Sequence, residues 1–359
     1  MTFKNFLVAL AAFAGISAAG AGTMPEVWTE KMPEQWKKLD ILVKSTADGT
    51  MQPASFYLPP QARRPAEKIP LLVALHSWSY GYEMKNPAAW AVNECARRGW
   101  AMLYPHFRGP NKTPQGCGSD LAVQDIVDQI KWALANHPID PDRVYILGGS
   151  GGGHMALIMA GRHPELFAGV YSACPITDIA RWRDESDAKL YPGYARMIES
   201  ACGGKPDEKP QEYARRSPLT WIKGARDAGL PVSIIAGIRD GHKRKDGGSV
   251  PVGHSIRAYN ILADEADRIS DAVMEEIEKN EKIPAELVFK GVDPYFSKGS
   301  EVLMRVVSGN VQLTIFNAGH AGNYNEGAAW LALQRRGRPA DWKVSAASAS
   351  KDAVSNVTK

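Results

Sequence analysis

The sequence predicts an α/β fold, a mostly parallel, doubly wound sheet with helices on both faces. Short apolar runs alternate with helical segments over most of the chain, which is the order that such a sheet requires. Residues 69–75 are an almost continuous apolar run, typical of a strand covered on both faces. Residues 119–136 carry apolar side chains on one face at helical spacing. Residues 148–152 form a glycine-rich turn between an apolar run and a helical run.

The first 21 residues have the pattern of a secretory signal peptide. Lys4 precedes the apolar stretch Leu7–Ile16, and small residues with a cleavage site at Ala19-Gly20-Ala21 follow. The stretch is too short to span a membrane, and no later segment supplies about 20 consecutive apolar residues. We therefore expect an exported protein, periplasmic or extracellular, without a membrane span.

Residues 22–68 are expected to hold two short strands and a connector ahead of the main domain. The strands cover 39–46 and 54–58, and Asp48-Gly49 supplies the turn between them. The main domain is expected over residues 69–343. Its predicted strands cover 69–75, 101–104, 144–147, 167–172, 232–237 and 311–316, and its predicted helices cover 86–98, 119–136, 154–160, 255–269, 271–281 and 326–334.

Residues 178–221 interrupt this alternation. They are polar, rich in arginine and tyrosine, and lack a strand pattern, which predicts a helical cap inserted into the sheet domain. An irregular stretch is expected after the helix 271–281 and up to residue 305. The alanine- and serine-rich tail, residues 344–359, is predicted to be disordered.

Composition narrows the possible partners. The 359 residues carry a net charge of only +4, and no basic run is interleaved with aromatic residues, so no nucleic-acid partner is expected. The four cysteines allow three disulfide pairings, and free buried thiols are an equal alternative. Their spacing does not match a zinc motif, so neither a metal nor a cofactor is expected. The cysteines are Cys95, Cys117, Cys174 and Cys202.

Ser150 lies at the centre of the sequence Gly148-Gly149-Ser150-Gly151-Gly152. A G-x-S-x-G turn between a strand and a helix is the pattern of a nucleophile elbow. Its glycines avoid clashes between the turn and the flanking elements, and the helix directs its positive end toward a developing oxyanion. The alternative interpretation is a glycine-rich surface loop with an unused serine. The strand and helix on either side favour a catalytic nucleophile.

An activated serine requires a base and an orienting carboxylate, and the order in this architecture is serine, acid, histidine. His320 follows the last predicted strand directly and is the candidate base, whereas His242 and His254 are expected at the surface. Asp240 directly follows the strand 232–237 and is the candidate acid. Asp246 and Asp293 are the alternatives, because both also follow Ser150 in the chain.

Candidate residues for the oxyanion hole are Gly151, which follows the serine, and Trp78, in the loop that begins at His76. Aromatic side chains could provide a stacking surface for a ring-shaped substrate or could simply pack in the core. Arg108, at the end of another strand, is a candidate substrate anchor, with a structural ion pair as the equal alternative. The candidate stacking residues are Trp78, Tyr80, Tyr82 and Trp182.

Together these motifs resemble the catalytic domain of the prolyl oligopeptidase family, within the α/β-hydrolase superfold. The resemblance covers residues 69–334 and rests on four motifs. It implies an α/β-hydrolase fold with Ser150 as nucleophile, Asp240 as acid and His320 as base. The motifs are Pro105–Gly109, Ile146–His154, Asp240 with the following Val250–Val252, and Gly319-His320.

The resemblance also implies an activity. Members of this family carry a large β-propeller that filters peptides by size, and the segment before residue 69 is too short to supply one. Propeller-free exported relatives are often esterases or carbohydrate deacylases. We expect an exported serine hydrolase acting on an ester or peptide bond of a small molecule, sugar ester or short peptide. The alternatives are a carbohydrate-directed esterase without peptidase activity and a catalytically idle binding module.

Overall fold

The computed structural model describes residues 37–63, 67–83, 85–188, 191–242, 245 and 247–344. The predicted signal peptide, almost all of the predicted disordered tail and Asp246 lie outside these residues. Within them, no helix has the length and apolar character needed to cross a bilayer.

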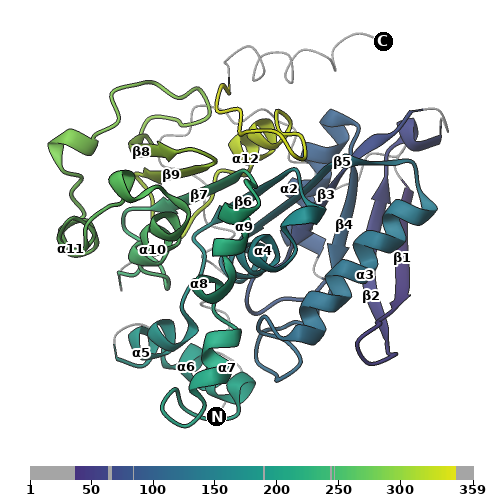
Figure 1. Cartoon of the computed structure of the whole chain (residues 1–359), viewed down its shortest axis with the longest axis horizontal. Coiled ribbons are helices and arrows are strands. Elements are labelled where there is room, and N and C mark those ends of the chain that lie inside the picture. Colours follow the sequence, from purple (N-terminus) through teal and green to yellow (C-terminus); the bar gives the residue numbers. More distant parts are fainter. Residues whose placement is uncertain are drawn as a thin grey trace.

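A single nine-stranded sheet forms the centre of the described chain (Figure 1). The strand order is β1-β2-β4-β3-β5-β6-β7-β9-β8. Strands β4, β3, β5, β6, β7 and β9 run parallel, whereas β1, β2 and β8 pair antiparallel at the two edges. The strands are β1 Lys37–Lys44, β2 Met51–Leu58, β3 Ile69–Leu75, β4 Ala101–Pro105, β5 Ile139–Gly149, β6 Gly169–Ala173, β7 Val232–Gly237, β8 Val302–Ser308 and β9 Val311–Phe316.

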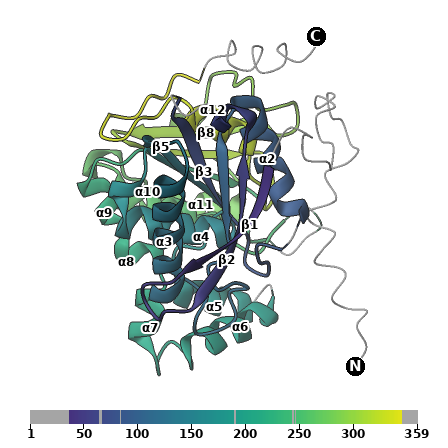
Figure 2. The same cartoon turned by 90° about the vertical axis from the view of Figure 1, so that its right-hand side faces the viewer.

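Helices cover both faces of this sheet, so the predicted doubly wound α/β fold is confirmed. Helices α3, α4 and α10 bury their apolar residues against one face, and α2 and α12 cover the other. Figure 2 shows α2 and α3 on opposite sides of the strands. These helices are α2 Lys85–Arg98, α3 Asp120–Asn136, α4 Gly151–Arg162, α10 Gly253–Leu262 and α12 Tyr324–Leu331.

Helix α3 shows how the local sequence determines where a helix begins and which face it buries. The Ser119 side chain accepts a hydrogen bond from the amide of Ala122 at 3.1 Å, which caps the first turn. Val123, Ile126 and Ile130 then recur at helical spacing and are buried against the sheet.

The segment between β6 and β7 is helical and forms the cap (Figure 1, lower part). Its core contains Trp182, Ile198 and Tyr213, and this core continues into the main domain at Trp78 and Val250. The cap is therefore packed onto the loops at the carboxyl ends of the strands. Its helices are α5 Ile179–Ala188, α6 Pro192–Cys202, α7 Pro210–Arg215, α8 Pro218–Trp221 and α9 Lys223–Asp227.

The structure also corrects two expected elements. Strand β8 begins in the stretch that is expected to be irregular. It pairs antiparallel with β9, and Val288 bridges to Met304 on its other side. The predicted helix 255–269 ends at Leu262, and a short 3-10 helix, η4 Glu265–Asp267, follows. Helix α11, Asp271–Asn280, matches its prediction closely. The remaining short 3-10 segments are η2 Pro60–Arg63, η3 Pro164–Leu166 and η5 Ala285–Leu287.

Candidate active site

Ser150 occupies the apex of a sharp turn between β5 and α4. Its backbone has φ 57° and ψ −118°, a conformation that a residue with a side chain rarely adopts. A Cβ at Gly148 would lie 2.4 Å from the backbone of Gly152, and a Cβ at Gly152 would lie 2.5 Å from the Leu75 carbonyl oxygen. Only glycines fit these two positions. The Ser150 side chain does not cap α4, so its hydroxyl is not used by the helix.

Asp240 and His320 form a hydrogen-bonded pair. His320 Nδ1 lies 2.6 Å from Asp240 Oδ2. The other carboxylate oxygen, Oδ1, accepts hydrogen bonds from the amides of Gly241 at 2.9 Å and Val250 at 3.1 Å. A carboxylate accepts, so the imidazole proton lies on Nδ1, and Nε2 is left with a lone pair. This is the arrangement that a general base requires.

The environment of His320 changes its basicity. Burial of the ring lowers its pKa, but the charge of Asp240 and their hydrogen bond outweigh burial and hold the pKa of His320 well above the ordinary 6.5. The neighbouring Cys174 thiol acts in the same direction. The ring is therefore poised as a strong base.

The end of β6 connects the serine with the histidine loop. The Ser150 amide donates to the Ala173 carbonyl oxygen at 2.8 Å. The next residue, Cys174, donates from Sγ to the Ala321 carbonyl oxygen at 3.0 Å. The nucleophile turn and the loop that carries His320 therefore meet at one short strand end, although they are far apart in the sequence.

Gly151 and Trp78 lie side by side at the serine turn. A Cβ on Gly151 would lie 2.4 Å from the Trp78 amide nitrogen. The Trp78 carbonyl accepts from the Asn111 amide at 2.9 Å and from its side chain at 3.3 Å, which holds this peptide group in place. In the part of the chain that the structure describes, neither amide donates to another group. Two such amides beside a serine have the character of an oxyanion hole.

The His76 side chain anchors the start of the loop that contains Trp78. Its ring stacks on Phe107, with centroids 3.8 Å apart, and its Nε2 lies 2.8 Å from the His106 carbonyl oxygen. Burial lowers the pKa of His76 to about 4, so the ring is neutral and structural.

Of the candidate stacking residues, the two tryptophans are core residues. Trp78 and Trp182 are 2% and 1% exposed and pack edge to face, with centroids 4.8 Å apart. Trp182 also donates from Nε1 to the Ser249 carbonyl oxygen at 2.6 Å. Their indoles are therefore packing aromatics that join the cap to the main domain, the alternative that the sequence left open. Tyr80 and Tyr82 are both partly exposed.

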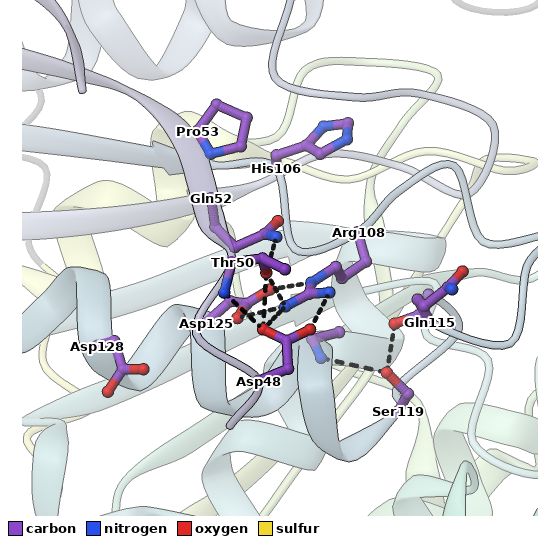
Figure 3. Close-up of polar contacts among 12 residues, drawn as sticks. Asp48, Thr50, Gln52, Pro53, His106, Arg108, Gln115, Ser119, Asp125 and Asp128 are labelled. Atoms are coloured by element: carbon purple, nitrogen blue, oxygen red, sulfur yellow. Dashed lines mark hydrogen bonds and ion pairs between the residues drawn. The ribbon is translucent and has the colours of Figure 1, made fainter. Parts of the chain in front are cut away.

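Arg108 is held by two carboxylates rather than left available to a substrate (Figure 3). Its Nη2 lies 3.1 Å from Asp125 Oδ1 and 3.1 Å from Asp48 Oδ1, and it also donates to the Thr50 hydroxyl. The Asp125 side chain is fully buried. This corresponds to the structural ion pair, so the proposed substrate anchor is corrected to a link between α3 and the β1–β2 turn.

His254 was expected at the surface, and that expectation is wrong. Its ring is fully buried; Nδ1 accepts from the Thr177 amide at 3.1 Å, and Nε2 lies 3.1 Å from Glu185 Oε2. The residue fastens cap helix α5 to α10. His242 remains partly exposed, as expected.

The other candidate acid that the structure describes has a different partner. Asp293 lies 2.6 Å from Nη1 of Arg305 in an ion pair next to β8. It is therefore bound away from the imidazole of His320.

Two residues beside the site were not singled out by the sequence. Cys174 follows β6 and contacts His320. Tyr194, on cap helix α6, lies next to the Ser79 side chain. Burial raises the pKa of Tyr194, and the nearby charge of His320 acts in the opposite direction. No local motif marks either one, because their proximity depends on how the cap folds back over the strand ends. The four cysteines themselves are all free and buried.

Comparison with known proteins identifies the family of the chain. Residues 88–276, just over half of the chain, match the model of the prolyl oligopeptidase family; the match includes Ser150 and Asp240 and ends before His320. The chain is similar to an uncharacterized peptidase of Bacillus subtilis, 29% identical over 42% of this chain and 55% of the relative. It is also similar to feruloyl esterase B of Neurospora crassa, 29% identical over 30% of this chain and 42% of the relative.

A structural comparison supports the fold. The solved structure of puromycin hydrolase matches 83% of this chain and 39% of that protein with a TM-score of 0.54 at 16% identity. The chain spans between 15% and 55% of the length of the curated relatives it matches. It belongs to the prolyl oligopeptidase family and has an α/β-hydrolase fold.

Proposed function

We propose that the protein is an exported serine hydrolase that cleaves a carboxylic ester or peptide bond with Ser150 as nucleophile, His320 as base and Asp240 as orienting acid. The observation that carries the proposal is the pairing of a strained serine turn with the Asp240–His320 hydrogen bond of 2.6 Å at the same end of the sheet. Export is supported by the apolar stretch Leu7–Ile16 and the small residues that follow it.

The mechanism uses these groups in sequence. His320 Nε2 accepts the hydroxyl proton as Ser150 Oγ attacks the carbonyl carbon, and the new oxyanion is stabilised by the amides of Gly151 and Trp78. The imidazolium then protonates the leaving alcohol or amine, and an acyl-enzyme remains. Water, deprotonated by His320, hydrolyses the acyl-enzyme and releases the acid. Asp240 stays ionised and stabilises the imidazolium in both halves of the reaction.

Both ester and peptide cleavage pass through this intermediate, so the leaving group is selected elsewhere. The relatives include proteins named as a peptidase and as an esterase. The cap and Tyr194 border the site, and their shape would decide which substrates enter. The proposed substrate is a small molecule, a sugar ester or a short peptide.

A fluorophosphonate probe tests the nucleophile. The wild-type protein should become labelled, and Ser150→Ala should not. Ser172→Ala is the matched control, because Ser172 is also buried and lies nearby, with its Oγ donating to the Gly153 carbonyl oxygen at 3.1 Å. Equal labelling of Ser150→Ala and wild type would overturn the assignment. A wild-type protein that takes no label would favour the idle binding module instead.

A substrate panel tests the reaction. Aryl esters, acetylated sugars and aminoacyl amides are compared by kcat/KM. Turnover of acetylated sugars without aminoacyl amides would make the protein a carbohydrate esterase, and the reverse would make it a peptidase. No turnover of any class by a protein that does take the probe would contradict the proposed hydrolysis of small acyl substrates.

A further inference from the structure

Three side chains of different chemistry, one of them the proposed catalytic base, meet at the carboxyl ends of the strands. They are the Cys174 thiol, the Asp240 carboxylate and the His320 imidazole, and one potential ligand atom of each lies within 4.8 Å of the other two. Cys174 and Asp240 are 3% and 1% exposed. The positions follow β6, β7 and β9, so the cluster exists only because parallel strands end at the same edge.

Thiolate, imidazole and carboxylate are the three ligand types that proteins use for zinc. Zinc bonds to sulfur at about 2.3 Å and to nitrogen or oxygen at about 2.0–2.2 Å, which places pairs of ligand atoms roughly 3 to 4 Å apart in a tetrahedral site. A bound cation would move His320 Nδ1 and Asp240 Oδ2 apart from their present 2.6 Å, with the Cys174 sulfur within 4.8 Å of both ligand atoms. Softer divalent cations prefer such a set, whereas magnesium and calcium prefer oxygen ligands alone.

Hydrogen bonds hold two side chains of the cluster in place, as they commonly do for metal ligands. Asp240 Oδ1 is held by the amides of Gly241 and Val250, which leaves Oδ2 as the oxygen aimed at the cluster. The Cys174 Sγ is directed into the same region, since it lies 3.0 Å from the Ala321 carbonyl oxygen beside His320. Hydrogen bonds of this kind orient ligands and raise the affinity of a site.

We propose that Cys174, Asp240 and His320 form an inhibitory site for a thiophilic divalent cation, with zinc as the best fit. When the cation binds, Cys174 releases its proton to solvent and Sγ bonds to the metal as thiolate. His320 bonds through Nδ1, and its single proton moves to Nε2. A metal-bound imidazole with a proton on Nε2 has no lone pair for the serine hydroxyl, so binding switches off the base.

Cation binding itself is independent of the proposed function, whereas the inhibition rests on it. The two are therefore measured separately. Cobalt(II) is added to the full-length protein as a spectroscopic probe, because a thiolate bonded to cobalt gives an intense near-ultraviolet absorption. Zinc is then added to displace it, and the stoichiometry is read from the loss of that band.

The variants separate the ligands from other residues. Cys174→Ala and His320→Ala should each lose the cobalt band. Cys95→Ala should keep it, and this is the matched control because Cys95 is also a free buried thiol but lies on helix α2 and is not part of the cluster. Ser150→Ala should bind cobalt as the wild type does, although it would be inactive. Melting curves establish that each variant is folded, and Cys174→Ser provides a second substitution at the key position.

Inhibition is measured with the substrate found in the panel. Zinc should inhibit the wild type and Cys95→Ala alike. The half-inhibitory concentration, taken relative to each variant's own activity, should rise more than about tenfold in Cys174→Ser, because even a group that only supports a ligand is typically worth that much. A wild type without a thiolate band, or a band that survives in folded Cys174→Ala or His320→Ala, would overturn the metal site. Failure of Ser150 to react with the fluorophosphonate would instead contradict the proposed function and leave the cobalt result standing.

Discussion

The His320 imidazole and the Asp240 carboxylate, 80 positions apart in the sequence, are joined at 2.6 Å between Nδ1 and Oδ2. The loop after β7 packs closely around this pair. A Cβ at Gly248 would lie 2.1 Å from Asp240 Oδ1 and 2.4 Å from His320 Cβ, so the loop after β7 closes tightly over the pair. The carboxylate is also fixed by two amides. The pair thus reaches the site already oriented, as an effective catalyst requires.

Asp240→Asn should preserve the fold and lower turnover by about 10⁴-fold. An amide in place of the carboxylate favours the wrong tautomer of His320, and a loss of that order is typical for serine triads. Steady-state kcat with the best substrate is the measurement. Asp246→Asn serves as control and should keep nearly full activity. If the two variants behaved in the opposite way, the role of the acid would pass to Asp246.

Activity should rise with pH, with a midpoint above 6.5 in kcat/KM. Asp240 raises the pKa of His320, and only the neutral imidazole can accept the serine proton. Because the pKa of His320 is higher in the folded protein than in the unfolded chain, protonation of His320 stabilises the fold below pH 6.5. This stabilisation is lost as the pH rises through the elevated pKa. In Asp240→Asn the midpoint of the residual activity should move down. A flat profile, or a wild-type midpoint below 6.5, would contradict His320 as the base.

Gly151→Ala should lower kcat by about 10²–10³-fold, the usual cost of losing an oxyanion donor. The new Cβ would lie 2.4 Å from the Trp78 amide nitrogen, so the two amides could not keep their positions. Gly193→Ala is the control, because nothing lies within 4 Å of a Cβ at that position in the cap. Kinetics with one ester substrate would distinguish them, and equal activity of both variants would argue against this oxyanion hole.

Arg108→Ala should destabilise the fold by about 3–5 kcal/mol, because it leaves the buried Asp125 carboxylate without its partner. The expected effect on KM is small, since the guanidinium serves carboxylates of the chain itself. Denaturant unfolding and kinetics at a temperature where the variant is folded give both quantities. Arg226→Ala removes an exposed ion pair with Asp264 and should cost less than about 1 kcal/mol. A stable Arg108→Ala with a greatly raised KM would restore the substrate-anchor role.

Glu326→Gln should stabilise the protein at pH 8 by up to about 3 kcal/mol. Burial in α12 raises the pKa of Glu326 to about 7, so the folded protein holds this proton more tightly than the unfolded chain. The contribution of Glu326 to the free energy of unfolding is therefore largest near pH 4 and declines as the pH rises to about 7. The glutamine side chain does not ionise, so this decline is absent from the variant. Thermal melting at several pH values tests this. Glu275→Gln, at an exposed helical position, should change little, and an unaltered pH dependence in Glu326→Gln would contradict the shift.

Strong local patterns allowed much of the fold to be predicted. The apolar run at 69–75 became β3, and the amphipathic helix at 119–136 became α3 almost to the residue. Both have signals that do not depend on distant parts of the chain. Strand β8 was missed because burial does not alternate with residue type along it: the apolar Val307 is exposed, whereas the polar Ser308 is buried.

The three residues proposed for the triad could be selected from the sequence because each follows a recognisable strand. Ser150 stands in a glycine turn, and Asp240 and His320 come directly after apolar runs, so the parallel topology brings them to one edge. Arg108 shows the limit of this reasoning, because its position after β4 was compatible with a substrate contact or an ion pair. Only the placement of Asp48 and Asp125 around it distinguishes the two.

Local order along the chain was thus sufficient to predict most strands and helices and to propose candidate site residues at their ends. The partners of buried side chains were not accessible in this way, including the meeting of Cys174 with His320, the burial of His254 and the packing of Trp78 on Trp182. Secondary structure reflects periodicities over a few residues, whereas these contacts join positions from tens to more than a hundred residues apart. They form when the strands assemble into the sheet and the cap packs onto it, and that packing depends on residues from distant parts of the chain.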